Sequence, residues 1–156
     1  MIESVTLWLE QIWAHPVWSD PAFFGWALVV LFSWAFLAAT VLSLPSEAAY
    51  LLLVLHYPAS HLLLWGVAST GNFLGGCTTL WMGAWLSTRK PIDLSPRARD
   101  VLQKWGGWAL LGSSIPVLGD AMVFAAGYLR LRLLPCLVAL GVGKAVRYAL
   151  LSGFAA

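Results

Sequence analysis

The sequence predicts an all-α integral membrane protein. In it, an inverted repeat of two re-entrant helical hairpins packs with transmembrane helices and follows an N-terminal amphipathic helix. Three observations lead to this fold class. Of the 156 residues 60% are apolar and only 10% are charged, whereas a soluble domain carries about 25% charged residues. Several apolar stretches are long enough to span a bilayer. Two proline breaks interrupt apolar segments in a similar order in the two halves of the chain.

The apolar stretches fall into two length classes. A spanning helix needs about 20 mostly apolar residues, and the stretches 23–44, 61–86 and 133–154 reach that length. The apolar pieces 48–55, 108–115 and 121–129 are too short to span. A chain of this length forms one domain. We divide it into an interfacial helix (1–22), a first repeat (23–86), a basic loop (87–104) and a second repeat (105–156).

The N-terminal segment has the pattern of an amphipathic helix. Apolar residues recur at helical spacing, with Glu3 and Glu10 on the other side and Pro16 as the expected end. The apolar residues are Ile2, Val5, Trp8, Leu9, Ile12 and Trp13. Such a helix lies in the membrane interface. Packing against the other helices is an equally good explanation, because the helix lacks a basic face.

Basic residues are concentrated in one connection. None of the nine Lys and Arg residues precedes Arg89, and five of them fall within 87–104. The positive-inside rule therefore predicts that this loop is cytoplasmic. Ten Trp residues suit a protein with a large interfacial surface. A membrane-flanking loop thus explains the charge better than a nucleic-acid-binding patch, and we expect no nucleic-acid partner.

The first apolar run breaks at Pro45, which is followed by Ser46 and Glu47. The next helical arm, 48–55, rises only about 12 Å, which cannot cross a hydrocarbon core about 30 Å thick. We therefore predict a re-entrant hairpin with its tip at 45–47. Non-helical backbone at that depth must be buried in protein or line a wet cavity.

The second half of the chain repeats this order. Trp105 lies 11 residues before Pro116, as Trp34 lies 11 residues before Pro45, and an acid follows each proline. Gly143 follows Pro116 by 27 residues, and Gly71 follows Pro45 by 26. Two hairpins that enter from opposite faces form an inverted repeat, as in secondary transporters. The alternative is a chance similarity between apolar segments.

Several motifs, taken together in order, resemble the DedA superfamily, also called the SNARE-associated or VTT-domain family. They are Leu44-Pro45-Ser46-Glu47, Gly71-Asn72-Phe73-Leu74-Gly75-Gly76, Trp105-Gly106-Gly107-Trp108, Pro116-Val117-Leu118-Gly119-Asp120 and Ala126-Gly127-Tyr128. The closing Gly143-Lys144-Ala145-Val146-Arg147-Tyr148 is similar to the YqaA branch in particular. The resemblance covers roughly residues 24–154.

The resemblance implies a multi-pass protein of the bacterial inner membrane with two facing re-entrant hairpins. It also implies lipid transport, of polyprenyl phosphate or phospholipid, driven in some members by the proton-motive force. The family's acid after the first hairpin proline corresponds to Glu47. Two arginines usual in the second hairpin are replaced here by Ser113 and Gly119. Because those arginines are natural phosphate ligands, their loss puts a polyprenyl-phosphate substrate in question, and Lys144 and Arg147 are candidates to replace them.

Four charged residues are candidates for a substrate or proton pathway. Glu47 and Asp120 would lie at membrane depth, where charges usually mark a pathway, although acids are also favoured at helix N-termini. Lys144 and Arg147 share one face of the last helix, and Lys144 lies near its middle. Our hypothesis is that the two acids face the two bases around a polar cavity. The alternative is that the bases reach the far interface by snorkelling.

The remaining candidates have weaker signals. Asn72 lies in the middle of a span and either contacts substrate or bonds a neighbouring helix. The hairpin-tip residues Pro45, Ser46, Pro116 and Gly119 are expected to shape the backbone. The three His residues lack the spacing of metal ligands, and Cys77 and Cys136 are expected to be packing residues. We expect no metal, no cofactor and no catalytic residues, because no nucleophile–base or nucleotide motif is present.

These features favour a transporter or flippase that moves a lipid or lipid phosphate and is coupled to protons. Its partners would then be membrane lipids and protons, and the sequence leaves a homo-oligomer open. Two other classes remain. One is an exporter of small molecules or cations, with acidic tips that bind positive substrates. The other is a structural or assembly protein in which the charges serve helix association. An enzyme is not expected.

Overall fold

The structure is a computed structural model of the whole chain and describes residues 20–40, 46–89, 91, 94–114 and 118–155. Every regular element in these ranges is a helix. They are α2 (Pro21–Ala38), α3 (Ser46–His56), η2 (Pro58–Ser60), α4 (His61–Leu86), α5 (Pro96–Trp105), η3 (Gly106–Ser114), α6 (Leu118–Tyr128) and α7 (Leu133–Ala155). The expected N-terminal amphipathic helix and the prolines Pro45 and Pro116 lie outside the described residues.

The beginning of α2 is set by local chemistry. The Asp20 carboxylate accepts a hydrogen bond of 2.8 Å from the Ala22 amide, and Pro21 occupies the first helical position. Both are strong N-terminal signals. Only Leu31, Ala35 and Ala38 of α2 are buried, whereas Trp26 is 69% exposed. An apolar helix with one packed face and an exposed apolar remainder suits a lipid environment.

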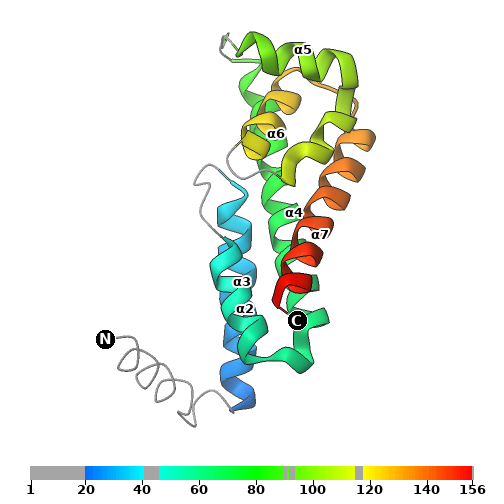
Figure 1. Cartoon of the computed structure of the whole chain (residues 1–156). Helices are drawn as coiled ribbons and strands as arrows, with labels where there is room; N and C mark the ends of the chain where they lie inside the picture. The colour runs from blue at the N-terminus through cyan, green and yellow to red at the C-terminus, as the bar shows by residue number, and fades with distance from the viewer. Residues whose placement is uncertain (1–19, 41–45, 90, 92–93, 115–117, 156) are drawn as a thin grey trace, which may run out of the picture.

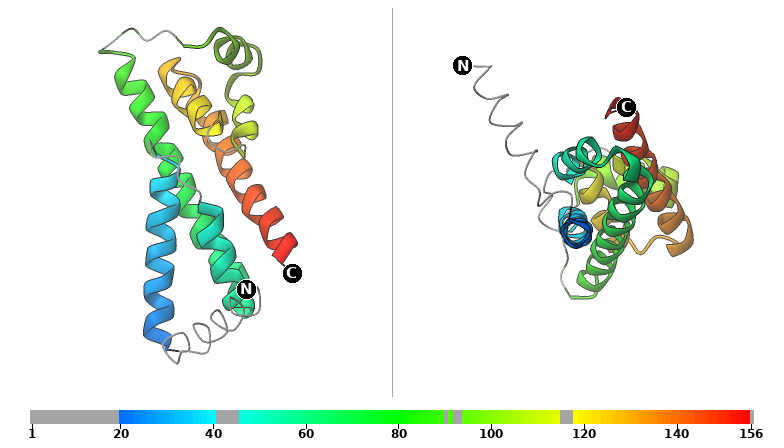
Figure 2. Two further views of the ribbon diagram at one scale, coloured as in Figure 1. Left: turned by 60° about the vertical axis from the view of Figure 1, so that its left-hand side comes forward. Right: turned by 90° about the horizontal axis from the view of Figure 1, so that it is seen from below.

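The described helices form two groups along the two long helices α4 and α7. Figure 1 shows α2 and α3 along one half of these helices, and η3 and α6 along the other half. The second view keeps the same separation (Figure 2). α2 packs on α4 and η3 packs on α7, whereas α3 packs on α7 and α6 packs on α4. Each group therefore contacts both long helices.

Glycines allow α4 to approach its neighbours closely. A Cβ atom on Gly75 would lie 2.3 Å from the Phe36 carbonyl oxygen of α2. A Cβ on Gly83 would lie 2.2 Å from the Phe124 carbonyl oxygen of α6. Small residues that bring backbones together are the usual means of helix association in lipid.

Two described helices, α2 and α7, are each long and apolar enough to cross a membrane. The pair formed by α3 and the segment Pro58–Leu86 passes the same test only when taken together, and it is bent by 117°. The sequence predicted a span over 61–86 alone. The α4 helix has that length, but its five glycines and Asn72 reduce its hydropathy.

The basic connection differs from the prediction, because half of it is helical. We predicted a loop over 87–104, and the structure forms α5 from Pro96 to Trp105. Pro96 suits the first helical position, and Gly106, with φ of 58°, ends the helix. Leu102 is fully buried while Arg97, Arg99 and Lys104 are exposed. The helix lies across one end of α4 and α7 (Figure 1).

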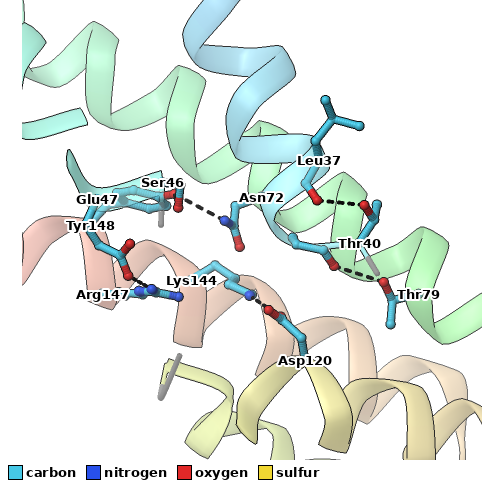
Figure 3. Close-up of polar contacts among 11 residues, drawn as sticks. Leu37, Thr40, Ser46, Glu47, Asn72, Thr79, Asp120, Lys144, Arg147 and Tyr148 are labelled. Atoms are coloured by element: carbon cyan, nitrogen blue, oxygen red, sulfur yellow. Dashed lines mark hydrogen bonds and ion pairs between the residues drawn. The ribbon is translucent and has the colours of Figure 1, made fainter. Parts of the chain in front are cut away.

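Two apolar clusters fill the two ends of the structure. One joins Leu80 and Leu102 with residues of η3, α6 and α7, and it includes the free thiol of Cys136. Cys77 packs against this cluster. The other joins Leu31 and Leu64 with residues of α3 and α7. The buried polar residues Ser46 of α3, Asn72 of α4 and Lys144 of α7 lie near the starts of α3 and α6 (Figure 3).

Candidate functional site

Lys144 of α7 is the most deeply buried charged residue described. Its side chain is 1% exposed, and its Nζ donates a hydrogen bond of 2.9 Å to Asp120 Oδ1. Asp120 lies in the first turn of α6 and is 11% exposed. An ammonium group at this depth needs an anionic partner, and α6 supplies one (Figure 3).

Arg147, also on α7, forms the second ion pair of the site. Its guanidinium pairs with Glu47 Oε1, in the first turn of α3. These side chains are 12% and 23% exposed, so this pair is more accessible than the one at Lys144. The two candidate acids thus come from the two short helices, and both candidate bases come from α7. The positive N-terminal ends of α3 and α6 also favour an acid in the first turn.

Tyr148 connects these elements and was not singled out from the sequence. Its hydroxyl hydrogen-bonds to Ser46 Oγ at 2.7 Å and accepts a bond of 3.2 Å from Asn72 Nδ2. Its ring packs edge-on against Tyr50 at 5.0 Å, and the Tyr50 hydroxyl bonds Ser152. The available signal was position, since Tyr148 lies one turn after Lys144 on the same face of α7.

Asn72 bonds a neighbouring helix, which was one of its two predicted roles. Its amide lies on α4 and reaches Tyr148 on α7. Its Oδ1 atom is buried and receives no hydrogen bond from any described residue.

Two of the expected hairpin-tip residues are described and buried: Ser46 is 1% exposed and Gly119 is buried. Ser46 therefore does more than shape the backbone, because its hydroxyl bonds Tyr148.

Known proteins similar to this chain are membrane proteins. The chain is 34% identical over 122 residues to the inner membrane protein YqaA of Escherichia coli (strain K12), covering 78% of this chain and 86% of that protein. The same values hold for YqaA of Shigella flexneri. The chain belongs to the YqaA family of inner membrane proteins. An uncharacterized Haemophilus influenzae protein is 35% identical over 130 residues, covering 78% of this chain and 83% of that one.

Membership of the YqaA family confirms the resemblance that the motifs indicated, since YqaA is a member of the DedA superfamily. With its apolar helices, it also establishes that this chain is a membrane protein. No family profile matches the chain, and no solved structure matches it.

The basic groups of the site in this YqaA-family chain lie on α7, whereas the resemblance implied arginines in the second hairpin. Gly119 occupies one of those arginine positions and carries no side chain, and the side chain of Ser113, at the other, lies outside the described part. Arg147 and Lys144 are thus the bases that the structure brings to the start of α3 and α6. Burying charges costs free energy unless they are paired, and each base here has a carboxylate.

The two described histidines, His56 and His61, lie away from this cluster. His61 Nδ1 is 3.0 Å from the Pro58 carbonyl oxygen, within the bend between α3 and α4. The His56 ring packs edge-on against Tyr57 at the same bend. His15 lies outside the described residues.

An apolar cavity lies beside the Glu47 helix. It has a volume of about 300 Å³ and opens between α2 and α3. Its lining is apolar throughout and includes Trp26, Val30, Ala49 and Leu52. Ala49 lies two residues after Glu47 and therefore on a different face of α3, so the cavity and the accessible ion pair occupy two sides of the same helix.

Proposed function

We propose that this protein moves a lipid or lipid phosphate across the bacterial inner membrane through a polar site formed by two re-entrant hairpins. The observation that carries the proposal is the pairing of Glu47 with Arg147 and of Asp120 with Lys144. Two short helices from distant parts of the chain thus bring their acids to one long helix. Ionisable groups held within a membrane bundle usually belong to a transport pathway.

The lengths of the short helices support the hairpin interpretation. α3 and α6 have 11 residues each, a rise of about 16 Å, which is about half of a hydrocarbon core. The exchange of partners, with α3 on α7 and α6 on α4, suits an inverted repeat of the kind found in transporters. In this arrangement the chain is multi-pass, and the end that carries α5 faces the cytoplasm because Arg97, Arg99 and Lys104 lie there.

Two kinds of surface on α3 support the proposed substrate class, namely the Glu47–Arg147 pair and the apolar cavity toward α2. Arg147 is a bidentate donor suited to phosphate, and its pairing with Glu47 is the more accessible of the two. The apolar cavity between α2 and α3 suits a lipid tail. A headgroup phosphate would displace Glu47 from Arg147, and protonation of Glu47 would favour that exchange. This is how protons would be coupled to lipid movement.

The paired acids also bear on the alternatives. An exporter of cations is less well supported, because a cationic side chain already neutralises each acid. An assembly protein is favoured by one observation, namely that Asn72 and Tyr148 bond across two helices. We propose no enzymatic activity, since the serine at the site, Ser46, bonds a tyrosine rather than a base.

The proposal is tested by reconstituting the protein in vesicles and measuring transfer of a fluorescent lipid phosphate and a fluorescent phospholipid between leaflets. Transfer that exceeds protein-free vesicles and increases with an imposed pH gradient is expected. A folded protein that moves neither lipid, with or without the gradient, would remove the transport proposal in favour of the assembly role. Labelling of single cysteines across 43–48 and 114–121 tests the hairpins, which predict access for small aqueous thiol reagents but exclusion of bulky ones.

A further inference from the structure

Asn72 has a buried polar atom without a protein partner. The side chain is 2% exposed, and Nδ2 donates to the Tyr148 hydroxyl. Oδ1 receives no hydrogen bond from any residue in the described ranges. A buried acceptor left without a donor destabilises the folded protein. This carbonyl oxygen therefore requires a donor from something other than the described side chains.

Lys144 has the opposite requirement. An ammonium group carries three N–H donors, and in the described part of the chain Lys144 donates to Asp120 alone. Lys144 lies one turn before Tyr148 on α7, and Tyr148 is the residue that Asn72 bonds. The close-up shows the Asn72 amide between Tyr148 and the Lys144–Asp120 pair (Figure 3).

These two requirements select the ligand chemically. It must accept a hydrogen bond from Lys144 and donate one to Asn72 Oδ1. A fully ionised phosphate has no proton to donate, and a metal cation is repelled by the ammonium group. An apolar group can neither accept nor donate a hydrogen bond. A neutral hydroxyl group can accept one from Lys144 and donate one to Asn72 Oδ1.

We propose that Lys144 and Asn72 together bind one hydroxyl group, supplied by a water molecule or by a lipid headgroup. The bound hydroxyl would join the Asp120–Lys144 pair to the Asn72–Tyr148–Ser46 hydrogen bonds. A continuous polar connection would then run from α6 to α3 through the site. This inference goes beyond lipid transport and does not depend on it, because binding is measurable without movement of lipid.

The chain offers a direct probe, since its three lysines are Lys90, Lys104 and Lys144. Protein labelled with ¹⁵N-lysine is reconstituted in phosphatidylcholine vesicles, whose headgroup has no hydroxyl, and in phosphatidylglycerol vesicles, whose headgroup has two. Solid-state NMR then measures magnetisation transfer from hydroxyl protons to the lysine Nζ atoms. The Lys144 signal is the one that disappears in Lys144→Met.

We expect transfer from a buried hydroxyl to Lys144 in the unmodified protein. Asn72→Leu should weaken it about fivefold, the change in occupancy for losing one hydrogen bond of ~1 kcal/mol. Thr79→Val is the matched control, because Thr79 is buried on the same helix but donates to the Ala39 carbonyl oxygen at 2.9 Å. It should leave the transfer unchanged.

Transfer in both lipids identifies water as the source, and transfer in phosphatidylglycerol alone identifies a lipid hydroxyl. Either result supports the site. The proposal is overturned if Lys144 shows no hydroxyl contact in either lipid, or a contact with phosphorus in its place. It also fails if Asn72→Leu, shown to be folded by its elution as a single species, leaves the transfer intact. If Asn72→Leu does not fold, the presence or absence of hydroxyl transfer to Lys144 in the unmodified protein decides whether the site exists.

Discussion

Tyr148 of α7 and Ser46 of α3 share a buried hydrogen bond of 2.7 Å between residues 102 positions apart. The same hydroxyl also accepts from Asn72 of α4. One phenol oxygen therefore ties three helices together beside the two ion pairs. Its loss should affect both the stability and the geometry of the site.

Replacing Tyr148 with Phe keeps the ring and removes this oxygen. Ser46 and Asn72 would each lose a buried partner, which costs about 1–3 kcal/mol per group. We expect a clear decrease in the midpoint of thermal unfolding in detergent. Tyr50→Phe is the control, because the Tyr50 hydroxyl bonds only the partly buried Ser152 among the described contacts. Equal decreases in the unfolding midpoint of the two variants would show that the Tyr148 hydroxyl stabilises the protein no more than the Tyr50 hydroxyl does.

Replacing Lys144 with Met should be among the most damaging single changes to stability. It leaves Asp120, which is only 11% exposed, as a charge without its partner, a change that costs about 3–5 kcal/mol for buried pairs. Adding Asp120→Asn should recover part of the loss, so the double variant loses less than the sum of the single ones. Thermal unfolding of all three variants measures this. Lys104→Met, at an exposed position of α5, should change little, and strictly additive losses would contradict the pairing.

Glu47→Gln separates transport from folding. The Glu47 side chain is 23% exposed, so water lessens the cost of breaking its pair, and stability should fall less than in Lys144→Met. Lipid transfer in vesicles should fall about tenfold or more, equivalent to ~1.4 kcal/mol in the barrier, because Gln cannot be ionised. Asp20→Asn is the matched control, since Asn also caps helices well. Full transport by folded Glu47→Gln would exclude a proton-carrying role for this residue.

Gly127→Ala tests the contact between α4 and α6. The added methyl carbon would lie 2.0 Å from the Leu80 carbonyl oxygen, so backbone atoms must move apart. We expect a loss of about 1–3 kcal/mol, read from thermal unfolding, with displacement of Asp120 at the start of α6. Gly66→Ala is the control on α4, where a Cβ meets nothing within 4 Å. It should be neutral or stabilising, because Ala is the better helix former.

Much of the helical pattern could be read from the sequence. The expected segments 61–86 and 133–154 agree closely with α4 and α7, because a long apolar run has few alternatives to a helix in lipid. Pro135 lies in the first turn of α7, where a proline is tolerated. The expected loop at 87–104 was half wrong, since the polar composition of α5 hid its helical pattern around Leu102. Amphipathic helices that lie across a bundle resemble loops when only hydropathy is considered.

The site was only partly predictable. Glu47, Asp120, Lys144 and Arg147 could be selected because charges in apolar segments are rare and costly. The pairing of each acid with its base could not be predicted, because it depends on how α3 and α6 are placed against α7. The role of Tyr148 could not be predicted for a related reason. A tyrosine in an apolar helix is ordinary, and it is distinguished here only by Ser46 and Asn72 on other helices.

The sequence by itself determined that this chain is a membrane protein. It also determined the positions of the long helices and identified the few charged residues that are costly to place in a bilayer. These properties depend on composition and on spacing along one segment. The tertiary structure alone decided that Lys144 joins Asp120, that Arg147 joins Glu47, and that Tyr148 ties α3 and α4 to α7. Such contacts join residues far apart in the chain, and their partners are fixed only when glycine-lined helices pack at close range.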